Sequence, residues 1–378
     1  MTLKIGILTL QSSSYPTIGR DFINGFELGA KNKQIEFFVE GIGFGANINQ
    51  VIDATQKLIN QHRVHLITGL IGHYQTDRLI QQMNSFEVPL LYSDLGANIP
   101  ARQKSPWVFC NSFDMFSSAI ETGACMVENG HTQVAVSSCY YDAGYGLTQA
   151  LEKGLYGSGG SFAGHFITPH IPRENEAGLM KQFMESVNPQ AIYALYDGIF
   201  AREHASFLQQ NQLSLQYPVY ASHFAIDQEI LDNYPVIFDR VKCVTSWMPE
   251  ESNPANQQFV LDYTDRYGKQ PSVFALLGYE NGAATCSALE KITKNTSPEI
   301  RKALETTDFN SPRGCFCFHP GLNRTIFDQQ LWAINWKNET YNKEKLAYSP
   351  KMTEIIINLM QQGDSTTSGG WYNAYLCR

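Results

Sequence analysis

The stretch from Val64 to Pro100 constrains the fold more than any other part of the sequence. Two short apolar runs, Val64–Thr68 and Pro89–Tyr92, flank a segment with helical periodicity. This order predicts a tight βαβ unit whose two strands are parallel neighbours. Ligands of open α/β sheets bind at the carboxyl ends of such strands. We therefore expect the loops Gly69–Tyr74 and Ser93–Asn98 to face one crevice.

Strands and helices alternate along most of the chain. The alternation begins with an apolar run at Leu3–Leu10, restarts after Gly130 and continues to a strand at Pro218–Ala221. Two successive runs of this kind, each long enough for its own sheet, predict two similar α/β lobes. A length of 378 residues agrees with this, because one typical core does not extend over so long a chain.

The end of the chain is less regular. A hairpin-like pattern joins Gly314–Phe318 to Ile326–Trp336 around a turn of sequence HPGLN. The tail after Gly363 is rich in Ser, Thr and Gly, and this composition predicts poor order.

Composition excludes several classes of partner. The 28 Lys and Arg residues against 36 Asp and Glu give a net charge of −8, and no basic run occurs, which argues against nucleic acid and anionic membranes. No apolar run approaches the length of about 18 residues that a membrane span needs, so we expect no direct membrane insertion. The eight cysteines show no Cys-x-x-Cys and no Cys/His ligand spacing, which argues against a metal site.

A nucleotide cofactor is also disfavoured. Residues 41–46, GIGFGA, match a G-x-G-x-x-A pattern between a strand and a helix. The pattern follows the second strand, however, and no acidic residue closes the next one, which ends Ile67-Thr68-Gly69. A glycine-lined turn is the better interpretation, and no cofactor is expected.

Catalytic motifs are missing from the sequence. It contains no G-x-S-x-G elbow and no H-E-x-x-H pair, and His62 and His65 fall across a helix end and a strand start. Glycosidase carboxylates need no fixed spacing, so a small-molecule hydrolase stays an open alternative. We expect a binding protein that is not an enzyme.

Five segments, in this order along the chain, resemble one family. They are KIGIL at 4–8, VHLITGLIG at 64–72, EVPLLYSD at 87–94, DAGYGL at 142–147 and PANQQFVLDYTDRYGKQPSVFALLGYENGAAT at 254–285. The chain is similar to the type I periplasmic solute-binding proteins of ABC importers, in particular the branched-chain amino acid/amide-binding group.

The resemblance implies an α/β fold with two doubly wound parallel-sheet lobes joined by three crossovers. These crossovers would fall near residues 111–115, 244–249 and 319–329. The first lobe would then comprise residues 1–113 plus 247–322, and the second lobe residues 114–246 plus 323–378. Ligand would bind between the lobes, which close around it by a hinge motion.

The resemblance also implies ligand-binding positions, carried over one by one. On the first lobe these are His73, Tyr74, Ser93 and Asp94, and on the second lobe Tyr145, Phe200 and His223. The family usually has an acidic residue near His223 to hold an α-ammonium group, and this departure puts a standard aliphatic amino acid in doubt.

A cationic or amide ligand is the other possibility. Asp94, Asp142, Asp197 and Glu280 could surround its polar group, and the aromatic residues Tyr74, Tyr145, Phe200 and Tyr279 could stack on its apolar part. Structural roles are open for some of these residues: a surface position at a helix start for His73, a bond to its own loop for Asp94, core packing for Tyr279 and a buried structural role for His223.

The sequence thus predicts a solute-binding receptor for a small polar organic ligand such as an amino acid or amide. A secreted receptor would lie in the periplasm or at the cell surface, without its signal segment here, and would deliver ligand to the membrane subunits of an ABC importer. A cytosolic amide-sensing regulator of the same fold is the alternative, and it would need no signal segment.

Overall fold

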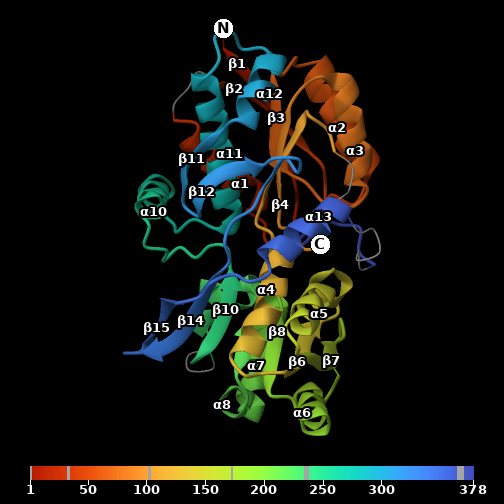
Figure 1. Cartoon of the computed structure of the whole chain (residues 1–378), viewed down its shortest axis with the longest axis vertical. Coiled ribbons are helices and arrows are strands. Elements are labelled where there is room, and N and C mark those ends of the chain that lie inside the picture. The colour runs from red at the N-terminus through yellow and green to blue at the C-terminus, as the bar shows by residue number, and fades with distance from the viewer. Residues whose placement is uncertain (1, 32–34, 101–103, 172, 234–237, 364–369) are drawn as a thin grey trace.

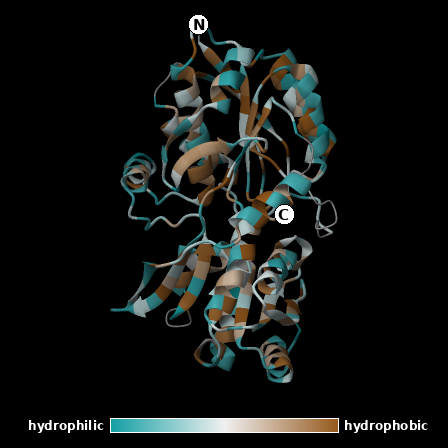
Figure 2. Cartoon of the chain, in the orientation of Figure 1, coloured by the Kyte–Doolittle hydropathy of each residue, from teal (hydrophilic) through white to brown (hydrophobic). Residues whose placement is uncertain are grey.

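The computed structural model describes residues 2–31, 35–100, 104–171, 173–233, 238–363 and 370–378. The chain forms two α/β lobes stacked along the long axis of the molecule, each built on one sheet (Figure 1). The strands are among the most hydrophobic segments of both lobes (Figure 2), and β3 (Leu66–Leu70) and β8 (Ala191–Leu195) are buried along their whole length. The predicted two-lobe fold is confirmed.

The first lobe has an eight-stranded sheet of order β11-β12-β13-β5-β4-β3-β1-β2. Its other strands are β1 (Leu3–Thr9), β2 (Ile35–Gly41), β4 (Leu90–Asp94), β5 (Val108–Ser112), β11 (Asp308–Ser311), β12 (Gly314–His319) and β13 (Arg324–Thr325). Its helices are α1 (Ile18–Gly29), α2 (Ile48–Asn60), α3 (Thr76–Phe86), α10 (Pro254–Tyr267), α11 (Val273–Glu290) and α12 (Ser297–Glu305). β3 and β4 pair in parallel, as the βαβ pattern predicts.

The second lobe has a seven-stranded sheet of order β15-β14-β10-β9-β8-β6-β7. Its other strands are β6 (Gln133–Cys139), β7 (Ser161–Thr168), β9 (Val219–Ala221), β10 (Val241–Thr245), β14 (Gln330–Lys337) and β15 (Thr340–Leu346). The helices are α4 (Met115–Glu128), α5 (Leu147–Gly157), α6 (Glu176–Val187), α7 (Gly198–Asn211), α8 (Leu213–Gln216) and α9 (Gln228–Asn233), with short 3₁₀ turns at Asp142–Gly144 and His223–Ile226. The last helix, α13 (Thr353–Gln362), lies between the lobes (Figure 1).

The end of the chain pairs differently from the predicted hairpin. β12 pairs with β11 and β13, whereas β14 pairs with β10 and β15 of the other sheet. The two runs therefore belong to different lobes. A hairpin does form around the HPGLN turn, where β12 and β13 pair antiparallel with His319 opposite Arg324. The prediction is wrong for Ile326–Trp336, because strand pairing between distant segments leaves no local signal. β13 pairs with β5, so Arg324 and Thr325 belong to the first sheet, although the sequence boundary assigned them to the second lobe.

The chain passes between the sheets three times, after Ser112, after Thr245 and after Thr325. Each passage leads from the end of a strand in one lobe to an element of the other lobe.

Among the described residues, no helix combines the length and hydrophobicity that crossing a bilayer requires.

Helices α1 and α11 pack unusually closely in the first lobe. Gly25 and Gly29 of α1 face Gly278 and Gly282 of α11, and a Cβ added at any of the four would overlap a backbone carbonyl of the opposite helix. The spacing of four residues places each glycine pair on one helix face. Close packing of these two backbones therefore requires glycine at all four positions.

We expect Gly25→Ala to destabilise the first lobe by about 3 kcal/mol, because the new methyl group overlaps the carbonyl group of Ala275 and the helices must separate. Gly41→Ala is the control, since an added Cβ there meets nothing within 4 Å and surface substitutions usually stay within about 0.5 kcal/mol. Urea unfolding of both variants measures the difference. Equal stability of the two variants would contradict the role of the glycine contact.

Candidate functional site

A cavity of about 960 Å³ opens between the lobes. The first lobe contributes the loop after β1, and the second lobe contributes residues at the carboxyl ends of β6, β7 and β8. Its lining residues include Ser13, Ser14, Tyr15, Tyr140, His170, Phe200, Glu203 and Arg378. The loops that follow parallel strands thus face one another across the cleft, as expected for open α/β sheets.

The tail segment, Gly370–Arg378, lies in this cleft between the lobes (Figure 1). The prediction of poor order after Gly363 is wrong for these residues, whereas residues 364–369 lie outside the described part of the chain. Ala374, Tyr375, Leu376 and Cys377 are buried, with exposed fractions of 0 to 4%. Their aromatic and apolar side chains make the segment part of the interior, which the Ser, Thr and Gly content upstream does not indicate.

Main-chain groups hold the tail segment against the first lobe. The Ala374 amide donates to the carbonyl of Phe44 at 2.8 Å, and the Ser13 amide donates to the backbone oxygen of Arg378 at 2.8 Å. His73 Nε2 lies 3.1 Å from the carbonyl oxygen of Trp371, so Nε2 must carry the hydrogen of that bond. These contacts fix the position of the segment without requiring particular tail side chains.

Side chains hold the tail segment against the second lobe. The Trp371 indole donates to the carbonyl of Tyr141 at 3.0 Å, and the Tyr145 hydroxyl donates to the carbonyl of Asn373 at 3.2 Å. The Tyr375 hydroxyl donates to Asp142 Oδ1 at 2.5 Å. The segment therefore bridges the two lobes.

Two buried carboxyl groups, Asp142 and Asp197, lie at the second-lobe end of these contacts. Both are 0% exposed. Burial raises the pKa of each group, and their mutual interaction raises that of Asp197 further, while Arg378 acts in the opposite direction on both. Arg378 Nη2 donates to Asp197 Oδ1 at 3.1 Å, which supplies the positive charge that these buried carboxyls need.

Four predicted site residues meet at the tail segment. His73 and Tyr145 contact each other edge to face, with ring centroids 5.7 Å apart, and both bond the segment. Tyr74 stacks on Tyr372 at 4.1 Å, and the Phe200 ring lies 4.3 Å from the Arg378 guanidinium. Burial lowers the pKa of His73. The structure thus brings together four predicted residues that lie far apart in the chain.

Ser93 and Asp94 lie at the edge of this arrangement. Ser93 is 0% exposed, and in the described part of the chain its hydroxyl has no hydrogen-bond partner. Asp94 accepts from Ser112 Oγ and pairs with Arg324 at 3.2 Å. With His73 it lines a small cavity of about 40 Å³ below the tail segment. The Asp94 carboxylate is therefore already bonded to other residues of the protein.

His223 faces a different cavity, of about 380 Å³, beside Tyr15 and Asp227. Its ring packs edge to face on Phe113, with centroids 5.0 Å apart. Burial, with a contribution from Lys343, lowers the pKa of His223 to about 3, so the ring is neutral near pH 7. A neutral ring carries no negative charge, so His223 does not supply the acidic group that the resemblance implies near this position.

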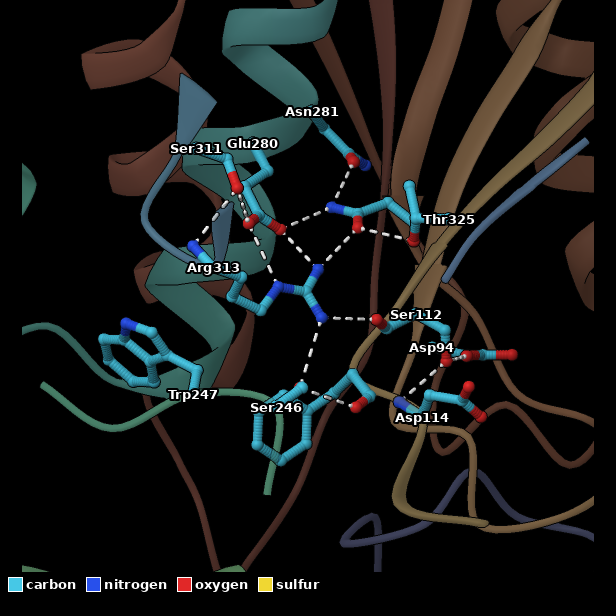
Figure 3. A network of polar contacts seen from close by, with 12 residues as sticks. Asp94, Ser112, Asp114, Ser246, Trp247, Glu280, Asn281, Ser311, Arg313 and Thr325 are labelled. Atoms are coloured by element: carbon cyan, nitrogen blue, oxygen red, sulfur yellow. Dashed lines mark hydrogen bonds and ion pairs between the residues drawn. The ribbon is translucent and has the colours of Figure 1, made fainter. Parts of the chain in front are cut away.

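Glu280 does not lie in the cleft. Its carboxylate is fully buried on α11 and pairs with Arg313, whose Nε and Nη2 donate to its two oxygens at 3.0 and 2.5 Å (Figure 3). Asn111 and Ser311 donate to the same carboxylate. The prediction of Glu280 as a ligand-binding residue is therefore corrected, because its oxygens are already bonded within the protein.

Arg313 connects the three crossovers. Its Nη1 donates to the carbonyl of Ser112 at 2.7 Å and lies 3.5 Å from Ser246 Oγ, and its Nη2 donates to Asn111 Oδ1 at 2.7 Å (Figure 3). Thr325 donates to the same Asn111 oxygen at 3.2 Å. Ser112, Ser246 and Thr325 each lie at a different crossover. We call Arg313, Glu280 and these partners the hinge network.

Arg313 and the tail segment were missed by the sequence reasoning. Arg313 lies 33 residues from Glu280, and no periodicity connects the two positions. The tail segment carries a signal that composition hides: WYNAY at 371–375 is dense in aromatic residues, which is unusual for a disordered end.

Proteins of known family and structure share this fold. A family model described as periplasmic binding protein matches residues 2–341. An ABC transporter substrate-binding protein from Sphaerobacter thermophilus is 21% identical, covers 93% of this chain and 98% of its own, and superposes with a TM-score of 0.81. Curated protein sequences give no match. These findings confirm the predicted family and a binding protein in preference to an enzyme.

Other similar structures have names that point to different solutes. A solute-binding protein from Rhodopseudomonas palustris BisB5, in complex with 3,4-dihydroxybenzoic acid, is 18% identical, covers 92% of this chain and 98% of its own, and has a TM-score of 0.75. A leucine-binding protein from Thermotoga maritima is also 18% identical, covers 91% and 98%, and has a TM-score of 0.65. At this identity the likeness concerns the fold alone.

We expect Glu280→Ala to destabilise the protein by about 3–5 kcal/mol, because it leaves the Arg313 charge buried without its partner. Glu305→Ala, which removes a partly exposed pair with Arg301, is the control and should cost about 0.5 kcal/mol or less. Guanidinium chloride unfolding compares the two. A small effect at both positions would contradict the role of the buried pair.

Proposed function

Because the chain belongs to the periplasmic binding protein family, we propose that it captures a small polar organic solute between its lobes and delivers it to the membrane subunits of an ABC importer. An amino acid, an amide or a related compound is the proposed class. The cavity of about 960 Å³, lined by polar and aromatic side chains from both lobes, carries this proposal. Its size suits a small organic molecule.

Phe200 of the second lobe lines this cavity and would contact the solute directly. His73, Tyr74 and Tyr145 contact the tail segment, so they would contact a solute where it replaces that segment. Aromatic rings at these positions would pack on the apolar part of the solute, while the polar groups around them fix its orientation. Because both lobes contact the solute, its binding depends on the position of one lobe relative to the other.

Closure of the lobes is the proposed mechanism. Hinge closure absorbs its backbone rotation at a few positions where the lobes join, and here those positions are the three crossovers. A solute favours the closed arrangement only through contacts that it makes there and not in the open one. Tyr145 and Phe200, on the lobe that swings toward His73, would supply those contacts.

The proposed location is outside the cytoplasm. The family description is that of a periplasmic protein, and several structurally similar proteins carry names of ABC transporter components. An importer receives its solute from a binding protein on that side of the membrane, so location and partner belong to one proposal.

Thermal shift against amino acids, amides, polyamines and aromatic acids tests the function. A solute at 100 times its Kd stabilises the folded state by about 2.7 kcal/mol, which raises Tm by roughly 5–10 °C for a chain with lobes of this size.

Phe200→Ala should weaken binding of the solute about tenfold, or about 1.4 kcal/mol. Tyr156→Ala, which removes an exposed aromatic residue on α5, should leave binding unchanged. A folded protein that no member of the panel stabilises would refute solute capture.

A further inference from the structure

The Arg378 guanidinium occupies a built subsite on the second lobe. It lies over the rings of Tyr141 and Phe200, at 4.5 and 4.3 Å from their centroids. Its Nε donates to Ser14 Oγ at 2.8 Å, and its Nη2 donates to Asp197 Oδ1 at 3.1 Å. Two aromatic faces with a carboxylate at the edge are suited to a planar cation.

The two carboxyl groups of this subsite interact with each other. The side chains of Asp142 and Asp197 hydrogen-bond, which requires a proton on one of them. Asp142 accepts from Cys139 and Tyr375, but neither donor is charged. Arg378 is thus a cation that offsets negative charge on the two buried carboxyls. Without it, the pair would either take up a proton or bind another positive group.

The subsite adjoins the proposed solute cavity. Arg378 and Phe200 both line the cavity of about 960 Å³, and the Arg378 side chain is 17% exposed. The backbone oxygen of Arg378 accepts from the Ser13 amide on the first lobe, while the guanidinium bonds Asp197 on the second. A single residue therefore bonds both lobes, which is the geometry that the proposed mechanism requires of a solute.

We propose that this subsite binds the cationic group of the solute, a guanidinium, amidinium or primary ammonium group, and that the tail segment is a tethered competitor for it. This inference rests on the proposed function, since it names the chemistry of the solute in the same cleft. The solute enters when the tail segment withdraws, and its positive group then replaces Arg378 between Asp197 and Phe200.

Competition of this kind lowers the apparent affinity. When the site is free for only a fraction of the time, the observed Kd rises by the inverse of that fraction. A tethered occupant competes at a high effective concentration, because it stays attached to the protein whose site it occupies. Removal of the Arg378 side chain should therefore strengthen binding of an external cation.

Calorimetry on the full chain tests this with two matched probes, butylguanidine and its neutral isostere butylurea. Arg378→Ala should bind butylguanidine at least tenfold more tightly than the parent protein, and butylurea should bind neither. The double variant Arg378→Ala with Asp197→Asn should bind butylguanidine at least tenfold more weakly than the single variant Arg378→Ala. Arg301→Ala, an arginine on α12 far from the cleft, is the control and should match the parent.

Alkylation of Cys377 reports on the tail segment independently of calorimetry. Its thiol is buried with 0% exposure, so modification located by mass spectrometry should be slow in the parent. Saturating butylguanidine, or Arg378→Ala, should accelerate it, and Arg378→Lys should restore protection.

Three results would overturn the inference: equal butylguanidine affinity in the parent and Arg378→Ala, tight binding of butylurea, or Cys377 protection that bound butylguanidine leaves unchanged. Failure here differs from failure of the proposed function. A neutral or anionic solute that stabilises the protein in the thermal panel, with no binding of butylguanidine to Arg378→Ala, would refute the cationic subsite and leave solute capture in place.

Discussion

The ion pair between Arg313 and Glu280 holds together the region on which the two-lobe arrangement depends. Both side chains are 0% exposed, and the guanidinium also bonds groups at two crossovers, Ser112 and Ser246. A buried pair is weak evidence for stability by itself, since desolvation offsets much of its attraction. Its consequence is geometric, because hinge motion must either keep these bonds or exchange them for others.

The tail segment adds a second connection between the lobes. The hinge network joins them where the backbone crosses, whereas the tail segment joins them across the mouth of the cleft, from Ser13 to Asp197 through Arg378. The arrangement of lobes in this structure is therefore one with the cleft already occupied by the chain. Under the proposed competition, a solute that takes the place of Arg378 must break those bonds, and its affinity is then a difference between two bound states.

Much of the fold could be predicted because its signals are local. Apolar periodicity located β3, β4 and the helix between them, and parallel pairing of the two strands followed from the short connection. The pairing predicted for the strands at the end of the chain was wrong, since β14 pairs with β10 in the sheet of the second lobe. His73, Tyr145 and Phe200 were found through the resemblance and the rule that loops after parallel strands converge.

The sequence by itself determined two α/β lobes and the loops of the first lobe that follow β3 and β4. These follow from residue type and spacing, which act over a few turns of chain. The aromatic residues of the second lobe were found only through the resemblance. Only the tertiary structure decided which charges meet. Glu280 pairs with Arg313 and Asp197 with Arg378 because long-range packing excludes water there, and a buried charge then takes the opposite charge that folding brings within reach. Neither pairing has a spacing that a sequence pattern could reveal.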